Sequence, residues 1–177
     1  ARNDPRWFSL CSALFFASFR KFYRPDDALC VRDETYIPGR IFWSRGNGWV
    51  IGAFARVLHH LPSYDRNRSE FVRYLTIMLH RIKALQRSDG LWSMDLTRET
   101  SPTETSGSAF FVYGLASAIN AGLVSAEEFK PATLRGWSAL VGKMNPDGSL
   151  GCVQPPGKEP VALAPGRPPR ARPTPSR

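Results

Sequence analysis

Apolar residues recur at intervals of three and four in five stretches of this chain: residues 5–23, 48–61, 67–87, 106–123 and 126–144. That spacing predicts helices, and no stretch alternates over a length typical of a strand. In the third stretch Phe71, Leu75 and Met78 share one face and charged residues occupy the other, which predicts an outer, amphipathic helix. The fourth stretch is apolar nearly all round, so we expect it to be buried on most sides. The pattern predicts an all-α protein of about five helices.

The order of these stretches repeats along the chain. An opening with small residues precedes an apolar helix, which is followed by an amphipathic helix and an Asp-Gly turn. The openings begin at Arg45 and Glu104, 59 positions apart, and the turns begin at Asp89 and Asp147, 58 positions apart. Matching intervals predict repeated hairpins of an inner and an outer helix, which stack into arrays or close into rings. The small residues allow either close helix packing or close approach of the backbone to a ligand.

The formal net charge of +9 indicates an anionic partner. Residues 155–177 hold five basic residues and one acidic residue, so about four of these charges belong to that tail and about five to the body. This balance suits a small anionic substrate, and the sequence contains no nucleic-acid recognition module. No apolar run reaches the roughly 18 residues of a membrane span. We therefore expect neither nucleic acid nor membrane as a partner.

The ends of the chain and its cysteines bear on its organisation. The first residues contain neither an initiator Met nor the order of a signal peptide, which predicts that the chain is the middle of a longer protein. Residues 155–177 are rich in Pro and Arg and are predicted to be disordered, after a partial domain at 1–154. Cys11, Cys30 and Cys152 are odd in number and lack ligand spacing, so they are predicted to be buried free thiols rather than disulfides or zinc ligands.

Trp43, Arg45 and Trp49 lie within seven positions of one another, around Gly46, Asn47 and Gly48. An indole can cover the apolar face of a sugar ring, and a guanidinium can hold a carboxylate through two parallel hydrogen bonds. This combination favours a site for an acidic sugar. On spacing alone, two core tryptophans and a surface arginine remain the alternative.

A glycosidase also needs a carboxyl group that donates a proton. Asp33, Glu34 and Glu104 are the acids nearest to the expected site, whereas Asp89 and Asp147 are turn formers. The sequence shows no Ser/His/Asp arrangement, phosphate-binding loop or metal cluster. Because these sites are not found, the sequence favours hydrolysis without a metal or another cofactor.

Three segments in this order resemble glycoside hydrolase family 105 and, more distantly, family 88: FWSRGNGWV at 42–50, QRSDGLW at 86–92 and ETSGSA at 104–109. The resemblance covers residues from about 3 to 160. It implies hairpins of the (α/α)6-barrel type, here an incomplete ring. It also implies a bacterial enzyme, cytoplasmic or periplasmic, that removes a terminal unsaturated galacturonyl residue from rhamnogalacturonan or pectin oligosaccharides.

The resemblance further implies a mechanism without a metal. In that family an aspartic acid protonates the C4=C5 double bond of the unsaturated uronate, water adds at C5, and the hemiketal opens and releases the neighbouring sugar. The segment that holds this aspartic acid would lie before Asn3, so the catalytic residue is not expected in this chain, and Asp4 matches a later loop. The implied substrate-binding residues are Trp43, Arg45, Trp49, Asn47, Arg32 and Glu104.

Several interpretations of function stay open at this point. In the first, the chain is part of an unsaturated rhamnogalacturonyl hydrolase, inactive by itself, with an unsaturated oligouronide as substrate. A hydrolase of unsaturated glucuronyl residues from other polyuronides is the alternative within the same chemistry. In the second, it is a non-catalytic sugar-binding remnant. In the third, it is a helical-repeat scaffold that binds no sugar.

Overall fold

The computed structural model describes residues 5–155, so the tail predicted to be disordered lies, from residue 156 on, outside the described residues. The described part is mostly helical: α1 (Pro5–Phe22), α2 (Ser44–His60), α3 (Arg68–Ala84), α4 (Thr105–Asn120) and α5 (Ala126–Val141). Two short antiparallel pairs, β1 (Tyr23–Arg24) with β2 (Leu29–Cys30) and β3 (Trp92–Ser93) with β4 (Thr103–Glu104), join the helices. The predicted all-α class and the five predicted helices are confirmed.

The first turn of α2 is the main departure from the predicted bounds. The helix begins at Ser44 rather than near Gly48, because Trp43 is extended and the backbone N–H of Asn47 donates to the Trp43 carbonyl at 3.0 Å. Glycine disfavours a helix, yet here Gly46 and Gly48 are both helical. A Cβ at Gly48 would lie 3.3 Å from Cα of Gly107, so the glycine is needed for close packing of α2 against α4.

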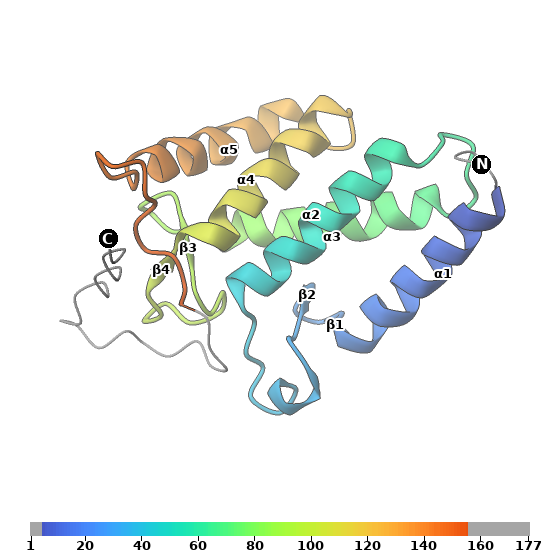
Figure 1. Ribbon diagram of the computed structural model, residues 1–177, viewed down its shortest axis with the longest axis horizontal. Helices are drawn as coiled ribbons and strands as arrows, with labels where there is room; N and C mark the ends of the chain where they lie inside the picture. Colours follow the sequence, from blue (N-terminus) through green and yellow to red (C-terminus); the bar gives the residue numbers. More distant parts are fainter. Residues whose placement is uncertain (1–4, 156–177) are drawn as a thin grey trace, which may run out of the picture.

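The predicted hairpins are visible in Figure 1, where α2 pairs with α3 and α4 pairs with α5. Helices α2 and α4 lie side by side in the same direction, so the two small-residue openings meet at one end. The predicted Asp-Gly turns close the outer helices, with Gly90 at φ 87° and Gly148 at φ 79°. Glycine adopts these positive φ angles without the strain that a Cβ brings.

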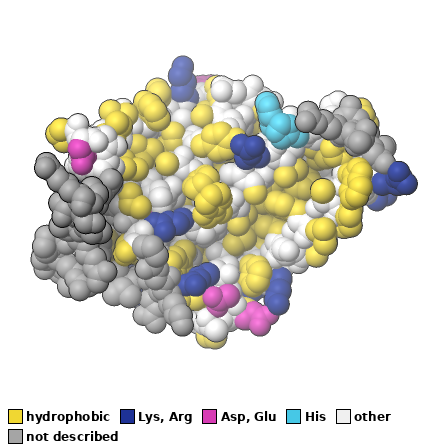
Figure 2. Space-filling view, in the orientation of Figure 1, with side chains coloured by type: hydrophobic (Ala, Val, Ile, Leu, Met, Phe, Trp, Pro, Cys, Tyr) yellow, Lys and Arg dark blue, Asp and Glu magenta, His cyan; other side chains and the backbone are white. Residues whose placement is uncertain are grey.

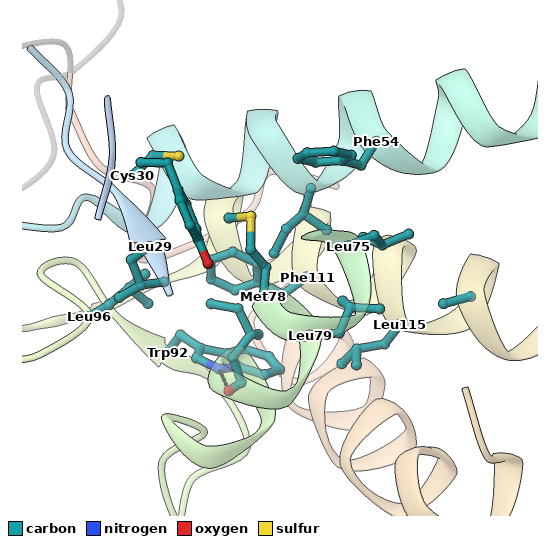
Figure 3. Close-up of a cluster of buried hydrophobic side chains, with 14 of the residues drawn as sticks. Leu29, Cys30, Phe54, Leu75, Met78, Leu79, Trp92, Leu96, Phe111 and Leu115 are labelled. Carbon is teal, nitrogen blue, oxygen red and sulfur yellow. Dashed lines mark hydrogen bonds between the residues drawn. The ribbon is translucent and has the colours of Figure 1, made fainter. Parts of the chain in front are cut away.

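The core lies between the hairpins. Figure 3 shows Phe54 from α2, Leu75 and Leu79 from α3, and Phe111 and Leu115 from α4 around one buried cluster. Trp92 closes this cluster, with its indole N–H donating to the Ile82 carbonyl at 2.7 Å. The amphipathic pattern predicted for α3 is confirmed, because Phe71, Leu75, Met78, Leu79 and Ile82 form its buried face.

Aromatic rings attach α1 to the hairpins. The ring of Phe15 lies 4.8 Å from that of Phe54, and the ring of Phe16 lies 4.5 Å from that of Phe71.

None of the helices between residues 5 and 155 is long and apolar enough to cross a membrane. The cysteine prediction is corrected in part. All three thiols are free, but only Cys30 is buried, because Cys11 lies on an outward position of α1 and Cys152 lies in an exposed turn at φ 57°.

One face of the inner helices is open. Trp49 and Tyr113 are exposed there, and with Phe110 they line an apolar hollow of about 500 Å³ between α2 and α4. Figure 2 shows hydrophobic side chains gathered on this side of the molecule. The prediction that α4 is buried on most sides holds for its faces toward α2, α3 and α5, and the remaining face carries Tyr113.

Candidate functional site

The candidate site lies where α2 and α4 begin, and Arg45 is its centre. Its Nε donates to the hydroxyl of Ser106 at 2.7 Å, and its terminal nitrogen donates to the backbone carbonyl of Gln154. The same nitrogen lies 3.7 Å from a carboxylate oxygen of Glu104. The side chain of Arg45 is 27% exposed. Arg45 thus joins three segments that are far apart in the sequence.

Glu104 is fully buried and caps α4. Its carboxylate accepts from the backbone N–H of Ser106 at 2.9 Å, of Gly107 at 2.5 Å and of Gln154 at 3.1 Å, and from the Ser106 hydroxyl. A carboxylate at a helix N-terminus satisfies orphan N–H groups and suits the helix dipole. Arg45 balances its charge. The oxygens of Glu104 are therefore occupied by the protein itself.

Trp43 lies between two loops at the start of α2. Its backbone forms a bridge with Asp95, and its side chain is almost completely buried. The guanidinium carbon of Arg32 lies 5.1 Å from the Trp43 ring centre and 5.8 Å from that of Tyr36. Arg32 is 40% exposed at its side chain. The structure therefore brings Arg32, Trp43 and Tyr36 together as a cation–aromatic group.

Asn47 has a different environment. Its side chain is completely buried, accepts from the Cys30 N–H at 2.8 Å, and donates to the carbonyls of Cys30 at 2.9 Å and Trp43 at 3.0 Å. The amide therefore ties β2 to the first turn of α2.

Burial also raises the pKa of the Cys30 thiol to about 12, so this thiol stays protonated at neutral pH.

Trp49 is placed one helical turn beyond Arg45. Its side chain is 62% exposed, and its ring centre lies 4.6 Å from that of Phe110. Trp49 lines the apolar hollow, which also includes Ser106, the hydrogen-bond partner of Arg45. Of the six predicted site residues, Arg45 and Glu104 are in direct contact, Arg32 and Trp43 stack, Trp49 borders the hollow and Asn47 is enclosed by backbone.

The candidate acids do not resemble a general acid. Asp33 accepts from the backbone N–H of Thr35 at 3.0 Å and from its hydroxyl at 2.5 Å, and these hydrogen bonds lower the pKa of Asp33. A general acid needs the opposite shift. Glu34 is paired with Lys21 at 2.7 Å, and both side chains are exposed. Within residues 5–155, no group of three or more His, Cys, Asp or Glu side chains is placed to hold a metal ion.

Gln154 is a site residue that the sequence analysis did not single out. Its backbone N–H and carbonyl contact Glu104 and Arg45, and the residue as a whole is only 2% exposed. The only signal in the sequence was its place within residues 3 to 160, the range that the family resemblance covers. Its position beside Arg45, which is 109 residues away in the sequence, follows from the fold.

Residues 4–165 match the sequence model of a family described as Glycosyl Hydrolase Family 88. A curated Unsaturated 3S-rhamnoglycuronyl hydrolase from Formosa agariphila is 32% identical over an alignment 172 positions long, which covers 89% of this chain and 46% of that protein. A protein of the same description from Alteromonas sp. (strain LOR) is 29% identical over an alignment 167 positions long, which covers 89% of this chain and 40% of that protein. The chain thus spans less than half the length of these curated relatives.

Solved structures show the same relationship. A glycosyl hydrolase family 88 protein from Bacteroides vulgatus superposes with a TM-score of 0.77 at 34% identity, over 82% of this chain and 45% of that one. A possible member of the GH105 family from Salmonella enterica superposes with a TM-score of 0.76 at 22% identity, over 85% of this chain and 41% of that one. The second likeness is one of fold.

Proposed function

The chain belongs to glycosyl hydrolase family 88, and on this premise we propose that it forms part of a glycosidase that removes a terminal unsaturated uronate from an oligosaccharide. The observation that carries this proposal is its similarity, over 89% of its residues, to two proteins described as Unsaturated 3S-rhamnoglycuronyl hydrolases. The proposed substrate is a 4,5-unsaturated uronate joined to rhamnose.

The chemistry of the unsaturated sugar supports a proposal that names the unsaturated uronate but not the polysaccharide from which it comes. Galacturonate and glucuronate differ only in configuration at C4, and elimination makes C4 and C5 trigonal. Both uronates therefore yield the same unsaturated residue. A pocket for that residue does not distinguish pectin fragments from other polyuronides. Specificity for one polysaccharide would depend on contacts with the sugar that leaves.

The side chains at the start of α2 support a binding role. Arg32 and Arg45 are both partly exposed and place positive charge on either side of Trp43 in the sequence, which suits a uronate carboxylate. Trp43 is held by Tyr36 and by the bridge to Asp95, so Arg32, which packs on the Trp43 ring, has a fixed support. Arg45 is held instead by Ser106 and Gln154. Trp49 offers an exposed indole one turn further along α2 for a sugar ring.

The proton in this reaction must reach C4 as the oxygen of a water molecule, which loses a proton, bonds to C5. The resulting hemiketal opens to a ketone at C5 and leaves a hemiacetal at C1. Collapse of this hemiacetal to an aldehyde breaks the bond to the neighbouring sugar, whose oxygen takes the hydroxyl proton. The side chain of Asp33 is 44% exposed and its pKa is lowered by hydrogen bonds from Thr35, and Glu104 is enclosed by donors. We therefore assign the proton donor to none of the three candidate acids of this chain. The family resemblance assigns it to an aspartic acid of a preceding segment.

The proposal is tested with the chain of residues 1–177 and a disaccharide of unsaturated uronate and rhamnose. Tryptophan fluorescence measures binding, and the ultraviolet absorbance of the conjugated double bond measures turnover. We expect saturable binding that Trp43→Ala weakens at least tenfold, with a matched control, Trp137→Ala, that binds like the wild type because Trp137 is exposed on α5.

The outcomes separate the open interpretations. Loss of absorbance would show that the chain is catalytic by itself, and binding without loss of absorbance would assign it the binding half of the site. Extension of the chain upstream through the aspartic acid segment should then produce turnover. If the extended chain binds the disaccharide without turnover, the interpretation as a sugar-binding remnant is supported. If the chain binds no disaccharide and Arg45→Ala changes nothing except stability, the interpretation as a helical-repeat scaffold is supported.

A further inference from the structure

Buried polar atoms without a partner occur on three residues that precede or contact Arg45. Within residues 5–155, Nε1 of Trp43, Oγ of Ser44 and both Oε1 and Nε2 of Gln154 are buried and have no hydrogen-bond partner. Trp43 and Ser44 directly precede Arg45, and Gln154 is hydrogen-bonded to it. Native proteins pair the great majority of buried polar groups, with protein, water or ligand. The unpaired carboxamide of Gln154, on a residue that contacts Arg45, is a group that a partner from outside the protein would satisfy.

The main chain of Gln154 is fixed on both sides. Its N–H donates to Glu104 at 3.1 Å, and its carbonyl accepts from Arg45. Arg45 and Glu104 are themselves 3.7 Å apart, and Glu104 is anchored at the N-terminus of α4. Gln154 is thus held at the junction of α2 and α4 without the use of its side chain. The carboxamide is the part of the residue that makes no hydrogen bond within the protein.

We propose that the carboxamide of Gln154 is a sugar-binding group of this site, held in position by Arg45 and Glu104 through its main chain. This inference rests on the proposed function. A carboxamide has one acceptor oxygen and two N–H donors, which match hydroxyl groups that both donate and accept. It carries no charge, so it contacts a sugar hydroxyl without repelling the uronate carboxylate. The main chain that carries it is held by two hydrogen bonds, which lowers the entropic cost of binding.

The test is Gln154→Leu, which keeps the volume similar and removes the polar atoms. An unpaired buried amide destabilises the unliganded protein, so its replacement by an apolar group should leave Tm unchanged or raise it. Loss of hydrogen bonds to the sugar should weaken binding of the unsaturated disaccharide about tenfold. A structural role for the side chain would give the opposite pattern, with a lower Tm and unchanged affinity.

Gln86→Leu is the matched control. The Gln86 amide donates to the carbonyls of Gly90 at 2.8 Å and Ala132 at 2.9 Å and accepts from Arg135 at 2.7 Å, so its polar atoms are used by the protein. This substitution should lower Tm and leave the affinity of the folded protein for the disaccharide unchanged. The two glutamines should therefore respond in opposite ways in both measurements.

Each result decides between the claims. A lower Tm for Gln154→Leu than for the wild type would overturn the inference, because it would show that the carboxamide stabilises the unliganded fold. Wild-type affinity in Gln154→Leu, next to weakened binding in Trp43→Ala, would overturn the inference and leave the proposed function intact. Absence of binding by the wild-type chain would overturn both.

Discussion

At the scale of the residue, Arg45 and Asn47 are two positions apart and are used differently. Both are polar, and the sequence placed both in one binding motif. Arg45 is partly exposed and contacts side chains and backbone of the second hairpin. Asn47 points into the protein, where three hydrogen bonds to backbone groups enclose its amide. We therefore assign Asn47 the task of fixing β2 against α2, which holds Trp43 in place.

Replacement of Asn47 by Ala should destabilise the chain. The N–H and carbonyl of Cys30 would stay buried without partners, and each unpaired group costs about 1–3 kcal/mol. We expect the free energy of unfolding, measured in urea, to fall by about 3 kcal/mol. Asn145→Ala is the control, since Asn145 is exposed and bonded to Ser149, and its effect should be within about 0.5 kcal/mol. Wild-type stability in Asn47→Ala would contradict this assignment.

At the scale of the element, the starts of α2 and α4 form the platform of the site. The two helices approach so closely that a Cβ at Gly107 would lie 2.5 Å from the carbonyl carbon of Ser44 and 2.7 Å from the backbone nitrogen of Arg45. Backbone atoms of a packed helix do not move aside cheaply. Close approach allows Arg45 to reach Ser106 and Gln154 across the helix interface. Close helix packing, one of the two predicted roles of these glycines, is thereby observed.

Gly107→Ala should separate the two helices and disturb the site. We expect a loss of about 3 kcal/mol in the free energy of unfolding, from overpacking against backbone. Gly46→Ala is the matched control in the same platform, because its Cβ would meet only Cβ of Trp43, at 3.6 Å. That variant should be as stable as the wild type, since alanine favours the helix. Equal thermal melting curves for Gly107→Ala and Gly46→Ala would refute the close-packing argument.

At the scale of the whole molecule, the described helices form an incomplete set of hairpins of the (α/α)6-barrel type. The predicted relationship to families 105 and 88 is confirmed by the family 88 match over residues 4–165. The inner helices leave Trp49 and Tyr113 exposed, beside hollows of about 500 and 370 Å³. A contiguous apolar surface of this kind favours association with another apolar surface.

We expect the isolated chain of residues 1–177 to self-associate through this face. Sedimentation velocity should show species larger than a monomer that increase with concentration. Trp49→Ser combined with Tyr113→Ser should shift the distribution toward the monomer, because both side chains line the hollow between α2 and α4. Trp137→Ser, on α5, should leave it unchanged. A monodisperse monomer with one cooperative unfolding transition would contradict this expectation.

Local patterns explain why so much of the fold was predictable. Within residues 71–82, apolar residues recur every three or four positions, and α3 buries them. The Asp-Gly turns at 89 and 147 are determined by the positive φ of one glycine each. The start of α2 was misplaced by four residues, because glycine counts against a helix in any local rule. Glycine is favoured at position 48 of the helix only because α4 packs too close for a side chain there.

The sequence by itself determined the all-α class, the hairpin repeat and, through the segments at 42–50, 86–92 and 104–109, the family, because these depend on residue types and on their intervals along the chain. The tertiary structure decided which side chains share a site. It placed Glu104 and Gln154 against Arg45, enclosed Asn47 in backbone and exposed Cys11 and Cys152. Such contacts join residues as many as 109 positions apart. They depend on how the helices pack, and no spacing along the chain encodes that.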